Sequence, residues 1–103
     1  MKPTFEIDFD RISNFEEFVS QVSRMLGISW NGNLDAFNDY LRGDMGTPEG
    51  GFILRWKNSS GAREMLGRVK SGEFRFDVLL EIIRMHGPGG SEAEDGIELE
   101  RLS

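Results

Sequence analysis

Two aspartates, Asp35 and Asp39, lie four residues apart in the segment SWNGNLDAFNDYLRG, which spans residues 29–43. In a helix this spacing places both carboxylates on one face, with roughly 5–6 Å between their Cβ atoms. Like charges at this spacing destabilise a helix by about 0.2–0.5 kcal/mol. Arg42 follows Asp39 by three residues and can pair with it, so a solvated helix face with one ordinary ion pair is the simplest interpretation.

Three kinds of chemistry compete with that interpretation. Glycosidases place two carboxylates on either side of a sugar bond, but so short a chain has little room for the cleft that such a site requires. Carboxylate oxygens can also hold a hard cation, although the sequence contains no EF-hand or similar ligand spacing. The third is charge mimicry, in which rigidly spaced carboxylates replace phosphate oxygens in a basic pocket of another protein.

The composition limits the other kinds of site. The chain has 103 residues, no cysteine and a single histidine, His86. Disulfides, thiolate zinc sites and cysteine nucleophiles are therefore excluded. A histidine metal site or a Ser-His-Asp triad would depend on His86, which reads more simply as a residue at a helix C-terminus. We expect no enzymatic activity, no metal site and no cofactor.

The charge balance favours a protein partner. The formal net charge is −6, and the 12 lysines and arginines form no basic stripe, which disfavours direct binding to nucleic acid. An acidic protein is better suited to meet a basic one. No apolar run approaches the length of a membrane span, and the N-terminal segment MKPTFEIDFD has no apolar signal region. We expect a cytoplasmic protein that is a monomer when free and does not bind membranes.

Three segments have the pattern of β-strands. Residues 5–9 alternate apolar and acidic side chains, 51–57 are apolar enough to be largely buried, and 97–100 alternate again. The segment 87–96 between the last helix and the last strand is rich in glycine, proline and acids. This composition predicts a mobile loop.

Four segments have helical spacing or capping residues. Ser13 and Glu16 predict a capping box for a first helix, which Gly27 would end. Asn33 can cap a second helix, which carries the two aspartates and ends at Gly43. The other two helices are expected at 59–66, capped by Ser59 or Ser60, and at 74–86.

The predicted order of elements is β-α-α-β-α-α-β. Strands that are separated by helices favour a parallel sheet with right-handed crossovers. The sequence therefore predicts an α/β fold, with a small three-stranded parallel sheet packed against about four helices. The length and the absence of an internal repeat predict a single domain over residues 1–103.

At GNLDAFNDYL, residues 32–41, the sequence resembles the barstar family, the small intracellular inhibitors of secreted bacterial ribonucleases. The resemblance continues at Leu54 and Trp56 in the second predicted strand, and the order of elements matches from end to end. Around the second helix, the positions that match the family pattern are Asn33, Leu34, Asp35, Ala36, Asp39, Leu41 and Gly43.

The resemblance implies a barstar-like fold and a protein that inhibits a basic ribonuclease, or gives immunity to a nuclease toxin. The second helix and the loop before it would cover the active site of the enzyme. Asp39 would mimic the phosphate, and Asp35 would pair with a basic residue at the rim. The implied partner-binding residues are Trp30, Asn31, Gly32, Asn33, Asp35, Asn38, Asp39, Gly43 and Asp44. The alternative is an acidic interaction module that does not inhibit an enzyme.

Three positions depart from the family pattern. Trp30 takes the place of a stacking aromatic before the loop, and Asn38 stands where an aromatic anchor is usual. Arg84 stands nearest to the position of an acidic residue in the last helix that adds to the contact. These departures predict a target other than a barnase-type ribonuclease.

Overall fold

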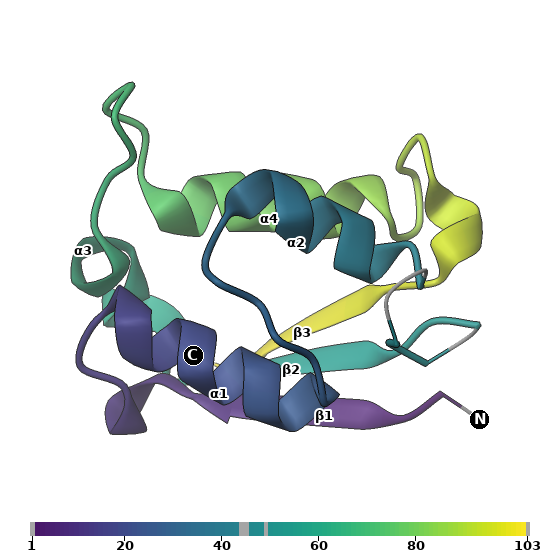
Figure 1. Ribbon diagram of the computed structural model, residues 1–103, viewed down its shortest axis with the longest axis horizontal. Helices are drawn as coiled ribbons and strands as arrows, with labels where there is room; N and C mark the ends of the chain where they lie inside the picture. Colours follow the sequence, from purple (N-terminus) through teal and green to yellow (C-terminus); the bar gives the residue numbers. More distant parts are fainter. Residues whose placement is uncertain (1, 44–45, 49, 103) are drawn as a thin grey trace.

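The computed structural model describes residues 2–43, 46–48 and 50–102. Its elements follow the order β-α-α-β-α-α-β (Figure 1), and its three strands are parallel, which confirms the predicted fold class. The elements are β1 (Thr4–Asp8), α1 (Phe15–Leu26), α2 (Leu34–Leu41), β2 (Ile53–Lys57), α3 (Ala62–Leu66), α4 (Arg75–Met85) and β3 (Glu98–Leu102). Three short 3-10 turns, η1 (Phe9–Arg11), η2 (Ser59–Gly61) and η3 (Ala93–Asp95), complete them.

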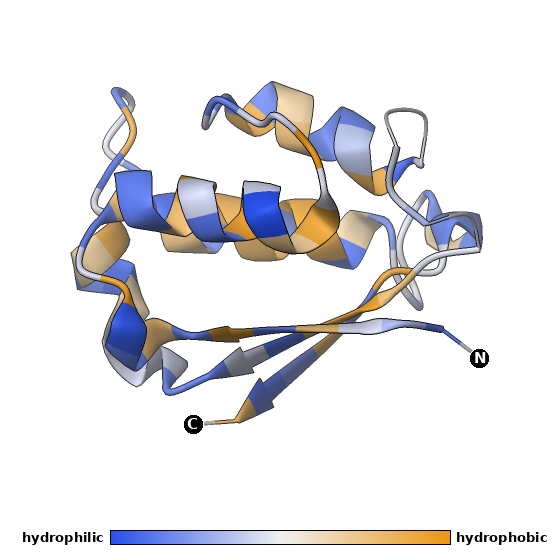
Figure 2. Cartoon of the chain, turned by 60° about the horizontal axis from the view of Figure 1, so that its bottom comes forward, coloured by the Kyte–Doolittle hydropathy of each residue, from blue (hydrophilic) through white to orange (hydrophobic). Residues whose placement is uncertain are grey.

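The sheet has the strand order β1-β2-β3, and its two faces differ in chemistry. The helices pack on one face, where Ile7, Leu54 and Trp56 are buried (Figure 2). The opposite face carries charged side chains, including an ion pair of 2.9 Å between Arg55 Nε and Glu100 Oε1. A sheet with one apolar and one solvated face explains why the strands alternate with period two.

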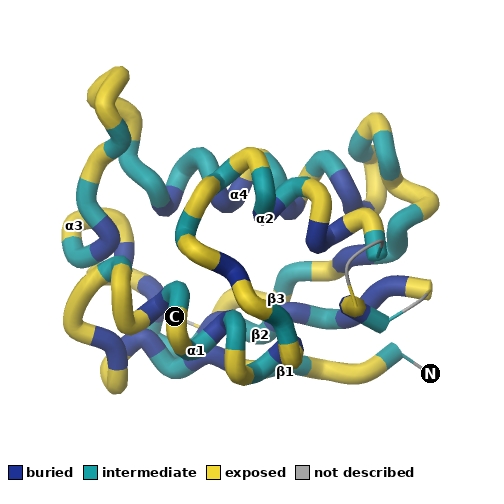
Figure 3. The backbone as a smooth tube through the Cα atoms, viewed as in Figure 1, coloured by how far each residue is buried: buried dark blue, intermediate teal, exposed yellow. Residues whose placement is uncertain are grey.

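An aromatic cluster fills the space between the sheet and the helices. Phe18 of α1 lies 6.2 Å, between ring centroids, from Trp56 of β2 and also from Trp30 of the α1–α2 loop. Trp30 in turn lies 5.0 Å from Phe37 of α2. These contacts fix α2 and the loop before it to the core, and buried and exposed stretches alternate along α2 (Figure 3).

The first helix begins one residue later than the sequence predicts. Asn14, not Ser13, is the N-cap, and its Oδ1 atom accepts a 2.9 Å hydrogen bond from Glu17 N. Glu17 Oε1 accepts a 2.6 Å bond from Ser13 N, so Glu17 rather than Glu16 closes the capping arrangement. Asparagine and serine cap helices about equally well, and the sequence alone did not separate the two registers.

Other boundaries also shift by one or two residues. β1 ends at Asp8 because its side chain caps the following turn, where Asp10 N donates to Asp8 Oδ1 at 3.0 Å. β2 begins at Ile53 because Gly51 has a φ of 91°, which a strand cannot accommodate. The position requires glycine, since a Cβ there would lie 2.2 Å from Gly96 O. β3 covers Glu98–Leu102 instead of 97–100.

The last two helices begin later than the sequence predicts. Neither Ser59 nor Ser60 caps α3, because both lie in the turn η2 and Gly61 precedes the helix. α4 begins at Arg75, and Phe74 is its N-cap without a side-chain hydrogen bond.

The segment 87–96 has a defined path in the structure. Glu92 N donates to Met85 O at 2.9 Å, Ile97 N donates to His86 O at 3.0 Å, and the turn η3 lies between them. The mobility of this segment stays a prediction.

Candidate partner-binding surface

Hydrogen bonds hold the loop before α2 in one conformation. Asn33 Oδ1 accepts from Ala36 N at 2.9 Å, which confirms Asn33 as the N-cap of α2. Asn31 Oδ1 accepts from Asn33 N at 3.0 Å, and Trp30 Nε1 donates to Asn33 O at 2.7 Å. A loop fixed in this way loses little conformational entropy when it binds a partner.

Trp30 supports this loop from inside. The residue is only 5% exposed, and its ring packs against Phe15, Phe18 and Phe37. A buried ring cannot stack on a partner, so Trp30 acts on the surface only through the loop that it positions. The sequence did not reveal this, because a tryptophan in a loop has no periodic pattern that reports its depth.

Gly32 lets the loop lie directly on α1. It has a φ of 95°, and a Cβ there would lie 3.2 Å from side-chain atoms of Phe15 and Val19. Both the left-handed conformation and the lack of space favour glycine. At the other end of the helix, Gly43 N donates to Tyr40 O at 3.1 Å. Asp44, the next predicted site residue, lies outside the described residues.

The two aspartates are exposed on α2, as the sequence predicts. The side chain of Asp39 is 55% exposed and its Oδ1 atom lies 2.8 Å from Arg42 Nη1, which confirms the expected ion pair. Arg42 also donates to both carboxylate oxygens of Glu92, at 2.8 and 3.2 Å. These bonds hold the pKa of Glu92 below its ordinary value and raise the pKa of Arg42. Asp35 has no ion pair within the part of the chain that the structure describes.

Asn38, between the two aspartates, turns toward the interior. Its Oδ1 atom contacts Nε2 of His86, a residue with no exposed surface at the end of α4. The other ring nitrogen of His86 lies 2.7 Å from Asp95 Oδ2. His86 therefore joins α2, α4 and the turn η3, and sequence reasoning missed this role. Its only signal was a lone histidine at the end of an apolar helix.

The ligand atoms of His86, Glu92 and Asp95 lie within 4.8 Å of one another, close enough in principle to hold a cation. Each group already has a partner, because Arg42 forms two hydrogen bonds with Glu92 and His86 contacts Asp95. A cation would have to displace a guanidinium that neutralises Glu92. We interpret the cluster as a structural network.

Arg84 lies on the other flank of α4. Side chains two positions apart on a helix point about 200° apart, and His86 contacts α2 through Asn38. Arg84 instead lines a groove with Pro88 and Leu99 beside β3. This placement removes the reason to expect that Arg84 repels a basic active site.

The Asn33 cap gives a first prediction. Asn33→Ala should lower the free energy of unfolding by about 0.5–2 kcal/mol, because the N–H of Ala36 loses its acceptor. Asn33→Ser should retain most of the stability, because serine is an equally good cap. Urea denaturation of the three proteins measures the difference. Equal stability of the alanine and serine variants would show that the cap contributes nothing.

The pairing of Glu92 with Arg42 predicts a pH dependence. A carboxylate whose pKa is lowered in the folded state stabilises the fold above its unfolded pKa, and this stabilisation is lost as the pH falls through the folded pKa. Glu92→Gln should therefore lower the melting temperature at pH 7 and have a much smaller effect near pH 3. Thermal melts of both proteins at the two pH values test this. A difference that does not change with pH would contradict it.

None of the described helices has both the length and the apolar character that a membrane-crossing segment needs.

A family model with the description Barstar (barnase inhibitor) matches residues 2–94. The match covers every element from β1 to α4, including α2 and the loop before it. No curated protein matches the chain.

Proposed function

Because the chain belongs to the barstar family, the family of barnase inhibitors, we propose that it inhibits a basic ribonuclease. In this proposal α2 and the loop before it cover the active site of the enzyme. The inhibitory surface comprises the exposed residues Asn31, Asn33, Asp35 and Asp39 and the half-buried Gly32 and Gly43. Asp44, which the sequence adds to this surface, lies outside the described residues. Trp30 and Asn38 support the surface from beneath, through their contacts with the core.

The carboxylate of Asp39 is the observation that carries the proposal. It is exposed on a helix that is capped, packed and hydrogen-bonded in place, and its charge has the sign of a phosphate. A ribonuclease must hold the scissile phosphate with cationic groups, and a preorganised carboxylate can occupy that position at little entropic cost. In this proposal Asp35, one turn earlier, meets a second cation at the rim.

Arg42 favours this role of Asp39. The guanidinium retains two hydrogen bonds to Glu92 when its bond to Asp39 breaks. Asp39 can therefore exchange Arg42 for a cation of the enzyme without leaving a guanidinium unpaired.

An inhibition assay tests the proposal. A panel of basic bacterial ribonucleases, including a barnase-type enzyme, is titrated with the protein while cleavage of a fluorogenic RNA is followed. We expect stoichiometric inhibition of at least one enzyme, which Asp39→Ala abolishes or strongly weakens. Asp10→Ala is the matched control, because Asp10 is an exposed aspartate in η1 and lies outside the inhibitory surface.

The assay also distinguishes the acidic interaction module. A protein of that kind would bind a basic enzyme, with a dependence on Asp35 and Asp39, and leave RNA cleavage unchanged. The enzyme panel includes a nuclease toxin, because an immunity protein for a toxin would use the same surface.

The charge of the segment predicts fast, salt-sensitive association. Residues 30–50 contain four acids and one arginine, a net charge of −3. Opposed to a basic active site, this charge should raise the association rate constant above the unsteered ~10⁵–10⁶ M⁻¹s⁻¹ and make it fall with salt. Stopped-flow mixing over a salt series measures it. A rate constant that stays the same from low to physiological salt would argue against electrostatic steering.

A further inference from the structure

β3 forms one edge of the sheet, and some of its backbone groups have no partner within the described part of the chain. Glu98 N donates to Phe52 O at 3.0 Å, and Leu102 O accepts from Asn58 N at 2.7 Å, so these residues of β3 direct their backbone toward β2. Because the direction alternates along a strand, Leu99 and Arg101 direct their N–H and C=O groups away from β2. An edge of this kind is a template for a further strand.

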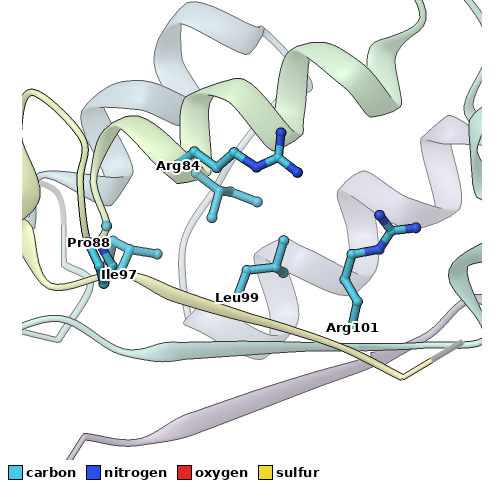
Figure 4. A pocket seen from close by; sticks show the side chains of 7 residues that line it. Arg84, Pro88, Ile97, Leu99 and Arg101 are labelled. Carbon is cyan, nitrogen blue, oxygen red and sulfur yellow. The ribbon is translucent and has the colours of Figure 1, made fainter.

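A groove runs beside this edge, between β3 and the end of α4. It has a volume of about 350 Å³, and its apolar lining comes from Ile83, Pro88, Ile97 and Leu99. Arg84 of α4 and Arg101 of β3 extend their guanidinium groups above this lining (Figure 4). The groove therefore combines apolar surface with two positive charges.

The two arginines have no carboxylate partner among the described residues. Arg101 Nε donates to Ser59 Oγ at 3.3 Å, and its guanidinium lies 5.1 Å from the ring centroid of Phe76. Arg42 and Arg55 have carboxylate partners. Arg24, Arg68 and Arg75 also lack one among the described residues and bond only to neutral acceptors, so the position of Arg84 and Arg101 beside the groove matters more than the missing partner. Two unpaired arginines beside an apolar groove are complementary to a ligand that carries carboxylates next to an apolar group.

A second copy of this chain fits the edge poorly. In an antiparallel pair of two β3 strands, facing residues share one side of the sheet. A register centred on Leu99 would place Glu98 opposite Glu100 of the other copy, and one centred on Glu100 would oppose the two Glu100 side chains. Like charges directly opposite one another destabilise a strand pair.

We propose that the β3–α4 groove binds an extended acidic segment of a partner protein, which adds a strand to the edge of β3. The backbone groups of Leu99 and Arg101 pair with the segment. One apolar side chain fills the space between Leu99 and Pro88, and carboxylates on either side of it bind Arg84 and Arg101. Strand addition of this kind obtains affinity from the backbone and specificity from alternate side chains.

This groove is separate from the inhibitory surface. Arg84 and His86 point to opposite flanks of α4, and α2 contacts the flank of His86. A ribonuclease bound to α2 and the acidic segment bound to β3 would therefore occupy different sides of the helix. Failure of the peptide experiment would leave the inhibition proposal untouched, and the reverse also holds.

The test uses the whole chain and a synthetic peptide, acetyl-TETVTET-amide, in which two glutamates and a valine share one face of a strand. We expect binding in isothermal titration calorimetry, weakened about tenfold or more by the double variant R84Q/R101Q. R84Q alone should give part of the loss, and R24Q, which changes an exposed arginine of α1, should give none. In 15N NMR spectra the largest shifts should occur at the amides of Leu99 and Arg101.

Three altered peptides test the charges and the strand pairing. The charge-reversed TKTVTKT should not bind. N-methylation of the central valine should abolish binding if the strand is antiparallel, and N-methylation of the two threonines beside it should do so if it is parallel. Binding that survives both N-methylated peptides, equal binding of TKTVTKT, undiminished binding to R84Q/R101Q, or no binding at millimolar peptide would overturn the proposal. A dimer of the chain through β3, seen by sedimentation, would assign the edge to a second copy instead.

Discussion

Asp39→Ala is expected to weaken binding to the inhibited ribonuclease by about 2–5 kcal/mol, roughly 30-fold to several thousand-fold in Kd. This is the general cost of removing one member of a desolvated charge pair, and barnase inhibitors are among the systems on which that generalisation rests. The cost is large because the cationic groups of the enzyme would remain buried without a partner. No other single change on the inhibitory surface should have a larger effect.

The same substitution should leave the fold intact. The Asp39–Arg42 pair is exposed, and exposed pairs contribute about 0–1 kcal/mol. Alanine is also the better helix former, which offsets part of this loss. The melting temperature should therefore shift by less than about 4 °C.

Calorimetric titration and thermal melting of the same preparation measure the two quantities. Asp39→Asn retains the size of the side chain and should lose nearly as much affinity, because only the charge is removed. Asp35→Ala should lose less affinity than either. If Asp39→Ala melts many degrees lower, or binds as well as the wild type, Asp39 does not mimic the phosphate.

The sequence predicted the features that depend on residues close to one another in the chain. The Asn33 cap, the helical spacing of Asp35 and Asp39, and the pairing of Asp39 with Arg42 all lie within ten residues, and all are confirmed. The order of elements followed from hydrophobic periods, which also act over short distances. Caps and strand ends shifted by one or two residues, because neighbouring polar side chains compete for the same backbone groups.

The depth and direction of several side chains were not predictable in this way. Trp30 is buried because Phe18 and Phe37 approach it from two different helices. Asn38 meets His86 across 48 positions of the sequence, and no periodic pattern connects them. A resemblance can place a residue such as Arg84 in the right helix, but only the packing of α4 shows which flank it occupies.

The contacts of His86 with Asn38 and Asp95 predict a large effect on stability, whereas Asp39→Ala is expected to affect binding. His86→Ala should lower the free energy of unfolding by about 2–5 kcal/mol, because it leaves a cavity at a fully buried position and removes the partner of both Asn38 and Asp95. Such a loss is a large fraction of the roughly 5–15 kcal/mol that stabilises a typical domain. The imidazole thus acts as an internal connection between α2, α4 and η3.

His86→Leu separates the two causes of this loss. Leucine fills most of the space but forms no hydrogen bonds, so this variant should lose about 1–3 kcal/mol from the unpaired polar groups alone. Urea denaturation at neutral pH gives both values, and equal stability of His86→Leu and the wild type would show that the hydrogen bonds contribute nothing. At a temperature where His86→Leu is folded, its affinity for the ribonuclease should fall less than that of Asp39→Ala. The reason is geometric: Asn38 turns inward to His86, whereas the carboxylate of Asp39, on the same helix, is exposed.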